Sequence, residues 1–165
     1  YRSKPVPRKK KDTDKSFIEI IRLLQRSAID IPSGKISNID TDLSDIDTRI
    51  KNLTKFFEGS RFLKSNEMIS FIMYDIEDHR IRRHIARFLL KKGCMRVQKS
   101  VFVGRLERKT VREMQEILKE IQAMYENNDS IFFLPAGEEN ISGMRVIGKN
   151  VDFEFAIGNK NTYFI

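Results

Sequence analysis

The chain has 165 residues, of which 40% are hydrophobic, and it carries a formal net charge of +8. This length allows one ordinary domain with an appendage. Its apolar runs are shorter than the roughly 20 residues that span a bilayer, and the basic start lacks the apolar segment of a secretory signal, so we expect no membrane association. The charge favours a polyanionic partner, with nucleic acid ahead of a membrane surface. The single cysteine, Cys94, cannot form an internal disulfide, which fits a reducing cytoplasm.

The excess positive charge lies mostly in the first part of the chain. Residues 1–66 hold fifteen Lys or Arg and nine Asp or Glu, whereas residues 67–165 hold sixteen and fourteen. The opening YRSKPVPRKKK has six basic residues and two prolines in eleven positions. Such a segment cannot bury a core, so residues 1–15 are interpreted as a basic arm that serves as a linker or contacts nucleic acid.

Residues 16–66 are interpreted as a helical extension with two helices. The first is predicted to begin at Ser16, which has the capping-box spacing to Glu19. Its apolar face consists of Phe17, Ile20, Ile21, Leu24 and Ala28. The second has apolar residues at alternating spacings of three and four from Ile36 to Phe57, which is a heptad seam, and Gly59 ends it. The seam suits a coiled coil with another chain or a hairpin with the preceding helix, and we favour the hairpin.

From residue 67 the pattern changes to short strands that alternate with amphipathic helices. MISFIMYDI predicts a buried central strand, and DHRIRRHIARFLLKKG predicts a helix that ends at Gly93. CMRVQ and SVFVGRL predict two strands, and a helix runs from a Thr110–Glu113 capping box to about Tyr125. SIFFLP, MRVIG and VDFEFAI predict further strands, with a polar loop after SIFFLP.

The resulting order, β-α-β-β-α-β with terminal strands, predicts a ferredoxin-like α+β domain over residues 67–165. Both of its helices should cover one face of a four-stranded antiparallel sheet. The other face then needs a partner, a ligand or a second protomer. This topology alone does not specify an activity, because many functions use it.

Few residues are candidates for chemistry. A P-loop is absent, and one cysteine excludes Cys-rich zinc sites. His79 and His84 are five residues apart, so we expect surface or packing roles. Asp75, at the carboxyl end of the first strand, suits a hard cation such as Mg²⁺ but would equally suit bonds to backbone amides of the turn. One aspartate per chain provides too few ligands for a metal site unless a two-fold axis supplies a second aspartate. Asp78 is predicted to cap the following helix.

That helix carries a row of basic residues opposite its apolar face. They are Arg80, Arg82, Arg83, Arg87 and Lys91. Such a stripe is usually a solvated face, but arginine binds phosphate oxygens with two parallel N–H groups and so suits phosphate better than lysine does. We therefore interpret it as a surface for the DNA backbone.

Two segments resemble CRISPR-associated protein 2. YDI at Tyr74–Ile76 is similar to the end of that family's first strand, and GCMRVQKSVFVGRL contains its R-x-Q-x-S-V-F pattern. The matching positions are Tyr74, Asp75, Arg96, Gln98, Ser100 and Phe102. The resemblance covers roughly residues 67–157, and residues 1–66 have no counterpart in the family's compact pattern.

The resemblance implies a homodimer in which each C-terminal strand lies against the partner's sheet. It implies that Asp75 of both protomers faces a shared cleft that can bind Mg²⁺ or Mn²⁺. It further implies a scaffold of CRISPR adaptation that bridges two integrase dimers and holds double-stranded spacer DNA. Some members have been assigned metal-dependent endonuclease activity. The stretch VDFEFAIGNKNTYFI could then serve as an integrase-binding tail.

Two other functions suit the same topology. One is a toxin-type or stand-alone metal-dependent endoribonuclease, which would use the same first-strand aspartate. The other is a ferredoxin-like RNA-binding module, which needs an aromatic pattern on the third strand. SVFVGRL does not supply that pattern, so this function ranks last.

Overall fold

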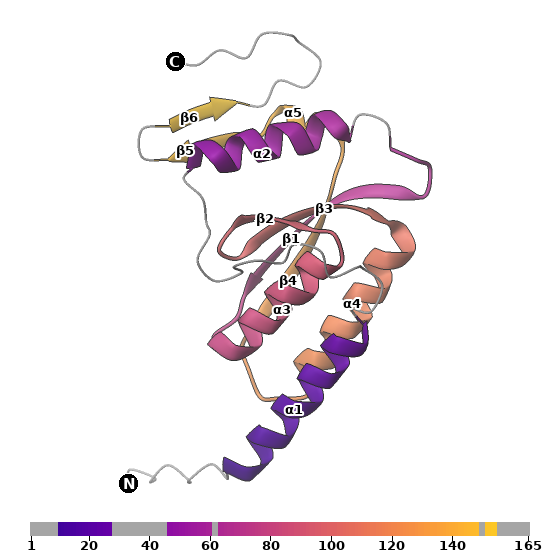
Figure 1. Cartoon of the computed structure of the whole chain (residues 1–165), viewed down its shortest axis with the longest axis vertical. Helices are drawn as coiled ribbons and strands as arrows, with labels where there is room; N and C mark the ends of the chain where they lie inside the picture. The colour runs from indigo at the N-terminus through magenta and orange to yellow at the C-terminus, as the bar shows by residue number, and fades with distance from the viewer. Residues whose placement is uncertain (1–9, 28–45, 61–62, 149–150, 155–165) are drawn as a thin grey trace, which may run out of the picture.

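The structure is a computed structural model that describes residues 10–27, 46–60, 63–148 and 151–154. Its centre consists of β1 (Glu67–Asp75), α3 (His79–Lys91), β2 (Met95–Gln98), β3 (Val101–Glu107), α4 (Arg108–Ala123) and β4 (Ser130–Ala136). The four strands form one antiparallel sheet in the order β2-β3-β1-β4, with β1 in its interior (Figure 1). This confirms the predicted ferredoxin-like α+β fold and the central first strand.

Helices α3 and α4 cover one face of this sheet. Because strand side chains alternate between faces, Ile72 and Tyr74 of β1 point to the helices together with Phe102 of β3. The helices contribute the apolar residues that their sequence periods predicted: Ile81, Ile85, Phe88, Leu89, Val111, Met114, Leu118 and Ile121. Burying a large apolar side chain stabilises a fold by roughly 1.5–3 kcal/mol, so this cluster is a main source of stability.

The ends of these helices differ in how well the sequence predicted them. Asp78 caps α3 and Gly93, with φ of 88°, follows its end, as expected. The Thr110–Glu113 capping box is wrong, because α4 begins at Arg108 and Thr110 lies inside its first turn. The reason is that β3 ends at Glu107 and passes into α4 without a loop, so the helix begins as soon as the strand ends.

Helix α1 (Lys10–Ser27) forms a further layer against α3 and α4. Its Ile20 and Leu24 are buried in the same core cluster, so the predicted apolar face is confirmed up to Ala28, which lies outside the described residues. The predicted start at Ser16 is wrong, because the helix already begins at Lys10. The preceding residues KKDTDK contain no Gly or Pro, and acidic residues near a helix N-terminus are favoured by its dipole.

Helix α2 (Ile46–Gly59) covers part of the opposite face of the sheet (Figure 1). Its buried Ile50, Leu53 and Phe57 belong to the predicted seam, and they pack in a second cluster with Ile69, Phe71 and Val103. The predicted hairpin of α1 and α2 is therefore wrong, since the two helices lie on opposite faces. The reason is that the sheet carries apolar residues on both faces, so the two helices pack in separate clusters. The first part of the seam, residues 36–45, lies outside the described residues.

The side chain of Arg105 fastens the end of α2 to the sheet. Its Nη1 donates to the backbone oxygen of Gly59 at 3.1 Å, and its Nε donates to Glu67 Oε2 at 2.9 Å. The backbone N–H of Lys64 and then the Arg105 guanidinium hold the pKa of Glu67 below its ordinary value of 4.5. Because the folded-state pKa is lowered, this contribution to stability is present above pH 4.5 and is lost as pH falls through the folded pKa.

After β4 the chain forms α5 (Glu138–Ser142) and a separate two-stranded sheet of β5 (Arg145–Gly148) and β6 (Val151–Glu154). The predicted strands are confirmed, but part of the predicted polar loop is the helix α5. Its one buried apolar residue, Ile141, explains this, because the side chain joins the α2 cluster. The end of VDFEFAI and the suggested integrase-binding tail lie outside the described residues.

Gly104 of β3 is closely surrounded by its neighbours. A Cβ there would lie 2.9 Å from Cys94 Sγ and 3.1 Å from Leu106 Cγ. Cys94 is itself buried, and burial raises the pKa of its thiol to about 12. We expect Gly104→Ala to lower the free energy of unfolding by about 1–3 kcal/mol, measured by urea denaturation.

The matched control is Gly59→Ala at the end of α2, where an added Cβ meets nothing within 4 Å. Alanine has the higher helix propensity, so this change should leave stability unaltered or raise it by up to about 1 kcal/mol. Equal effects of the two substitutions would contradict the close packing at Gly104.

Candidate nucleic-acid interface and metal site

Asp75 is the last residue of β1, and its side chain is exposed. The residues on either side of it, Tyr74 and Ile76, are buried, so the alternation of the strand turns Asp75 away from the helix-side core. It pairs in register with Ser130, the first residue of β4. The carboxylate makes no hydrogen bond or ion pair within the part of the chain that the structure describes. The turn amides that could have occupied it are therefore not its partners there.

The turn between β2 and β3 holds the end of β1 in place. The backbone N–H of Tyr74 donates to the oxygen of Ser100 at 3.0 Å, and its hydroxyl donates to the oxygen of Lys99 at 3.4 Å. The ring is 5% exposed and lies 5.8 Å from that of Phe102. Burial raises the pKa of Tyr74 above its ordinary value, so the hydroxyl stays a neutral donor at pH 7. These contacts fix the backbone immediately before Asp75.

Arg96 closes the same turn from the other strand. Its Nε donates to the backbone oxygen of Gln98 at 3.3 Å and its Nη2 to that of Lys99 at 2.7 Å. The guanidinium also lies 5.7 Å from the centre of the Phe102 ring. The R-x-Q-x-S-V-F segment thus builds the turn that supports Asp75, while the Gln98 side chain is exposed. The sequence predicted these positions as a motif without predicting this role.

Asp78 is the helix cap that the sequence predicted. Its Oδ1 accepts the backbone N–H groups of Arg80 at 2.7 Å and Ile81 at 3.2 Å. These two hydrogen bonds and the nearby Arg80 charge outweigh burial, which acts in the opposite direction, and the pKa of Asp78 is lowered. A capping carboxylate of this kind is already committed to the backbone.

Asp129 is a neighbouring carboxylate that sequence reasoning missed. Its Oδ1 accepts the backbone N–H of Glu77 at 2.9 Å, and its Oδ2 accepts the hydroxyl of Tyr125. Burial and then this hydrogen bond raise the pKa of Tyr125 above its ordinary value. Asp129 thereby ties the loop after β1 to the start of β4. The polar run ENNDS carries no motif, and the contact spans 52 residues, so no local signal marked it.

Asp75 fits a hard divalent cation as one ligand only. Carboxylate oxygen is what Mg²⁺ prefers, and Mg²⁺ commonly takes one or two protein carboxylates. Within the described ranges, however, no three His, Cys, Asp or Glu side chains are grouped so as to hold a metal ion. A complete site thus requires an oxygen ligand from elsewhere, for which a second copy of Asp75 across a two-fold axis is suited.

Two members of the basic row make contacts within the protomer. The guanidinium of Arg80 lies 4.4 Å from the centre of the Phe17 ring of α1 and 3.6 Å from Asp78 Oδ2. Arg82 points the other way, where Nη1 donates to the backbone oxygen of Ile76 at 3.4 Å and Nη2 contacts His79. Both residues therefore organise the start of α3.

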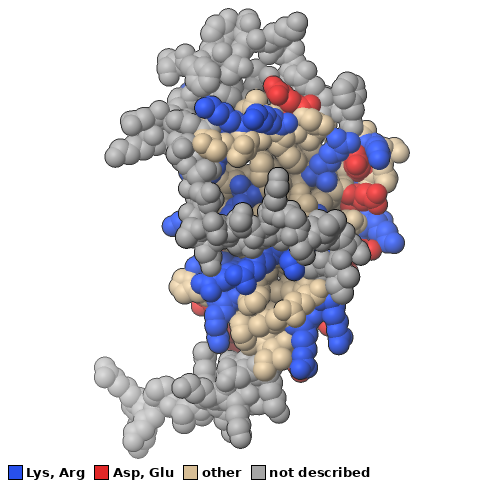
Figure 2. Space-filling model, in the orientation of Figure 1, with Lys and Arg blue, Asp and Glu red and all other residues tan. Residues whose placement is uncertain are grey.

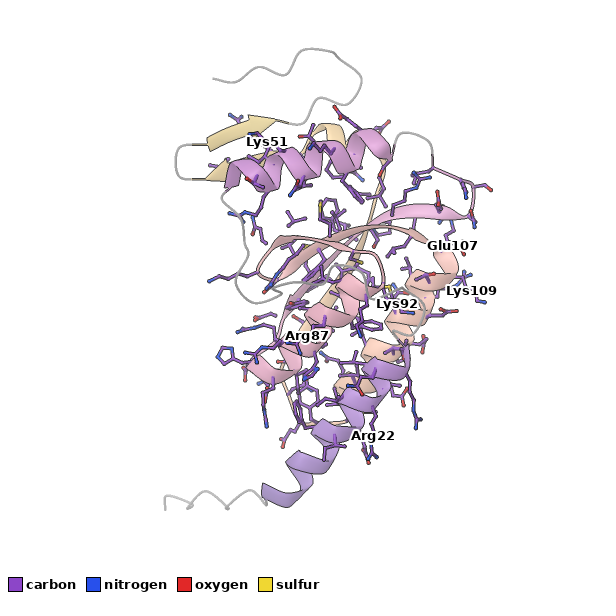
Figure 3. The ribbon with its side chains drawn as sticks, in the orientation of Figure 1. Arg22, Lys51, Arg87, Lys92, Glu107 and Lys109 are labelled. Atoms are coloured by element: carbon purple, nitrogen blue, oxygen red, sulfur yellow. The ribbon has the colours of Figure 1, made fainter. Side chains whose placement is uncertain are left out.

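Arg83 and Arg87 are exposed one turn apart on α3, and Lys91 is partly buried one turn further on. Figure 2 shows Lys and Arg gathered over α3, whereas blue and red are mixed where α4 begins. Figure 3 labels Arg87 on α3 and Arg22 on the neighbouring α1. This outer side of α3 is the part of the predicted stripe that faces solvent.

The two histidines have the surface and packing roles that were predicted. His79 is exposed, and the His84 ring packs edge-on against Phe17 with centroids 5.8 Å apart. Burial, followed by the charges of Arg87 and Arg83, lowers the pKa of His84 below 6.5. The ring is accordingly neutral at pH 7.

The third strand does not present aromatic rings to solvent. Phe102 is the one aromatic residue of β3, and it is 0% exposed. This arrangement disfavours an RNA-binding module that stacks bases on that strand. Among the described helices, none is both long and apolar enough to cross a membrane.

Comparisons with known proteins identify the region that carries these features. A family model described as CRISPR associated protein Cas2 matches residues 68–144, from β1 to the residue before β5. The chain is also 32% identical over 57 residues to the CRISPR-associated endoribonuclease Cas2 of Korarchaeum cryptofilum (strain OPF8). That alignment covers 34% of this chain and 61% of the relative's length. Residues 68–144, with Asp75 at the end of β1 and the motif turn beside it, are thus similar to the CRISPR-associated protein Cas2 family.

Proposed function

We propose that this protein is a dimeric scaffold of CRISPR adaptation that binds double-stranded spacer DNA and bridges two integrase dimers. The observation that carries the proposal is the exposed basic row of α3 on a helix whose N-terminus is fixed beside Asp75. Arg83 and Arg87 present planar forks that suit phosphate oxygens, and they lie on the outer side of a helix that the core holds rigidly. Such contacts recognise the DNA backbone and not the base sequence. They therefore suit a protein that binds spacers of varied sequence.

The DNA-binding surface is tested with Arg83→Gln and Arg87→Gln combined. Each arginine that contacts a phosphate should reduce the slope of log affinity against log salt by about 1. We expect weaker duplex binding and a shallower slope, measured by fluorescence anisotropy over a salt series. The control is Lys109→Gln with Arg112→Gln at the exposed start of α4, which removes the same charge. Equal losses in both variants would contradict a specific role of α3.

The homodimer is supported by apolar surface around the edge strand β4. Phe132 is 60% exposed and Leu134 is 53% exposed, on the sheet face that α2 covers only in part. An exposed apolar edge strand is a template for pairing with another chain. The β5–β6 pair is an isolated two-stranded sheet with Ile147 77% exposed, and such pairs are marginal alone. We infer that a second copy covers this region through the C-terminal strands.

Leu134→Glu tests this interface, because it places a charge in the surface that the dimer would bury. We expect the variant to dissociate at concentrations where the wild type is dimeric, measured by analytical ultracentrifugation. Ile18→Glu is the control, since Ile18 is also an exposed apolar residue, 49% exposed, but lies on α1. A wild type that is monomeric throughout the micromolar range would refute the dimer.

A second candidate activity is metal-dependent cleavage of RNA or DNA. It is favoured by the name of the curated relative and by an Asp75 carboxylate without a described partner. Two copies of Asp75 would hold Mg²⁺ or Mn²⁺, which when bound lowers the pKa of a water ligand and offsets phosphate charge. In each copy, Tyr74 and the β2–β3 turn would hold the backbone next to the Asp75 carboxylate, and α3 would pack against β1. The neighbouring carboxylates Asp78 and Asp129 already accept backbone N–H groups, so neither is well placed as a general base, and we expect hydrolysis to be slow.

Asp75→Asn separates the two activities, because it keeps the shape of the side chain and removes its charge. We expect it to reduce Mg²⁺- and Mn²⁺-dependent cleavage to background while dimerisation and duplex binding stay unchanged. Glu77→Gln, an exposed carboxyl two residues away, is the control. Loss of spacer acquisition in Asp75→Asn with an intact DNA-bound complex would contradict a purely scaffolding role. RNA cleavage without integrase binding would favour a stand-alone endoribonuclease.

A further inference from the structure

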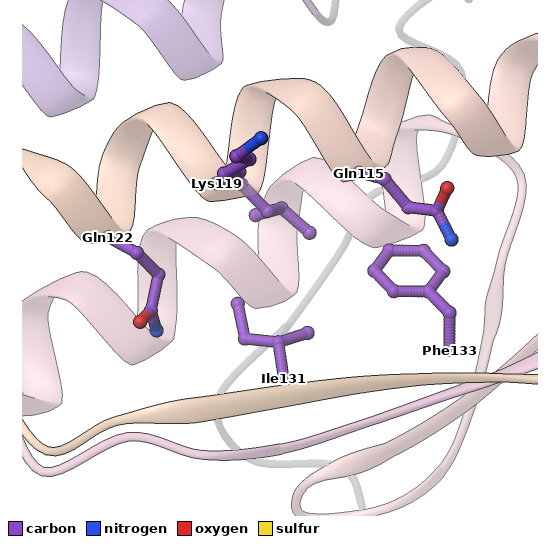
Figure 4. A pocket seen from close by; sticks show the side chains of 6 residues that line it. Gln115, Lys119, Gln122, Ile131 and Phe133 are labelled. Carbon is purple, nitrogen blue, oxygen red and sulfur yellow. The ribbon is translucent and has the colours of Figure 1, made fainter.

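A cavity of about 290 Å³ lies between α4 and the edge strand β4 (Figure 4). It is lined by Gln115, Leu118, Lys119, Gln122, Ile131 and Phe133. None of these residues belongs to the Asp75 site or to the basic row of α3. The proposed scaffold and cleavage functions therefore do not use this cavity.

The two walls of the cavity differ in chemistry. Helix α4 contributes Gln115, Lys119 and Gln122, at spacings of four and three residues, so they share one side of the helix. Strand β4 contributes Ile131 and Phe133. Gln115 and Lys119 are exposed and Gln122 is partly buried, so this polar row lies beside the apolar row of α4 that packs on the sheet. Polar groups converging on an apolar floor are typical of small-ligand sites.

One polar group on this wall, the side-chain amide of Gln122, has a nitrogen without a hydrogen-bond partner among the described residues. This nitrogen, Nε2, is buried. A buried donor without an acceptor is costly, and native proteins rarely keep one without a reason. Figure 4 shows this side chain beside Ile131, on the side of α4 that faces β4. Rotation of the amide towards the cavity would let the nitrogen donate to an acceptor placed there.

We propose that this cavity binds one unstacked nucleobase. Phe133 supplies a ring for stacking, and the amides of Gln115 and Gln122 offer both donors and acceptors to the edge of a base. Lys119 is exposed at the rim, where its ammonium would meet the adjoining phosphate. The volume lies at the lower limit of about 300 Å³ for ligand pockets, which suits a single base and excludes a base pair.

This inference goes beyond the proposed function, because the base contact in the cavity is separate from the phosphate contacts of α3. A nucleobase with its phosphate could reach the cavity as a free mononucleotide or as an unpaired residue of a nucleic-acid strand. The chemistry of recognition is the same in both cases. The two sources differ in whether neighbouring nucleotides contribute to affinity, and the experiment uses that difference.

The experiment measures the fluorescence of 2-aminopurine, which stacking on an aromatic ring quenches. The probes are 2-aminopurine ribonucleoside monophosphate and a single-stranded oligothymidylate with one central 2-aminopurine. We expect saturable quenching of at least one probe by the wild-type chain. Binding of the monophosphate as tightly as the oligonucleotide identifies a free nucleotide as ligand, and markedly tighter binding of the oligonucleotide identifies a strand. The absence of saturable quenching with both probes would overturn the proposal.

Two variants connect the signal to the cavity. Gln122→Met keeps the side-chain length and removes the amide, and Phe133→Leu keeps the apolar floor and removes the ring. We expect each to weaken probe binding by about tenfold. Gln25→Met, at an exposed glutamine of α1, should leave binding unchanged. Quenching that survives both cavity variants at wild-type affinity would place the base elsewhere and refute the site.

Folding and duplex binding serve as separate readouts. Because Gln122→Met removes an unpartnered buried donor, we expect its melting temperature to equal or exceed that of the wild type. A loss of probe binding in this variant is then not a loss of fold. Affinity for duplex DNA should be unchanged in both cavity variants. Failure of the α3 variants to weaken duplex binding would count against the proposed scaffold function alone.

Discussion

The burial of Tyr74 is the constraint on which the rest of the site depends. Its ring is enclosed by the helix-side core, while its N–H and hydroxyl both bond the turn between β2 and β3. Since a buried side chain cannot leave the core without losing apolar burial, β1 has one register and one end point. Asp75 then faces solvent as the next residue of an alternating strand, and α3 can begin four residues later, directly after its cap Asp78.

One face of the sheet is covered by the protein's own helices, whereas the other face is covered only in part. On one face α3 and α4 complete a core, which α1 covers further through Ile20 and Leu24. On the other face α2 covers β1 and β3 but leaves Phe132 and Leu134 of β4 exposed. The N-terminal helices thus pack on both sides of the sheet domain, and they leave Arg87 of α3, the β4 edge and the α4–β4 cavity exposed.

Sequence periodicity predicted the strands and helices of the domain because each buries one side of a regular element. It also predicted Asp78, since capping depends on residues within one turn. It failed for Ser16 and Thr110, because the capping-box pattern is short and the helices simply began earlier. The side of the sheet that α2 covers is set by tertiary packing. The residues of the β2–β3 turn that support Asp75 were recognisable in the sequence only as a motif. Asp129 contacts Glu77 across 52 residues, and no local pattern predicts such a contact.

The direct passage of β3 into α4 has a consequence for how the protein can change. Strand residues alternate every two positions and helix residues every 3.6, so an uninterrupted junction couples the rotation of α4 to the register of β3. One residue inserted at Glu107 would turn the helix by about 100° and carry Met114 and Leu118 out of the core. The junction therefore tolerates substitution but not a change of length.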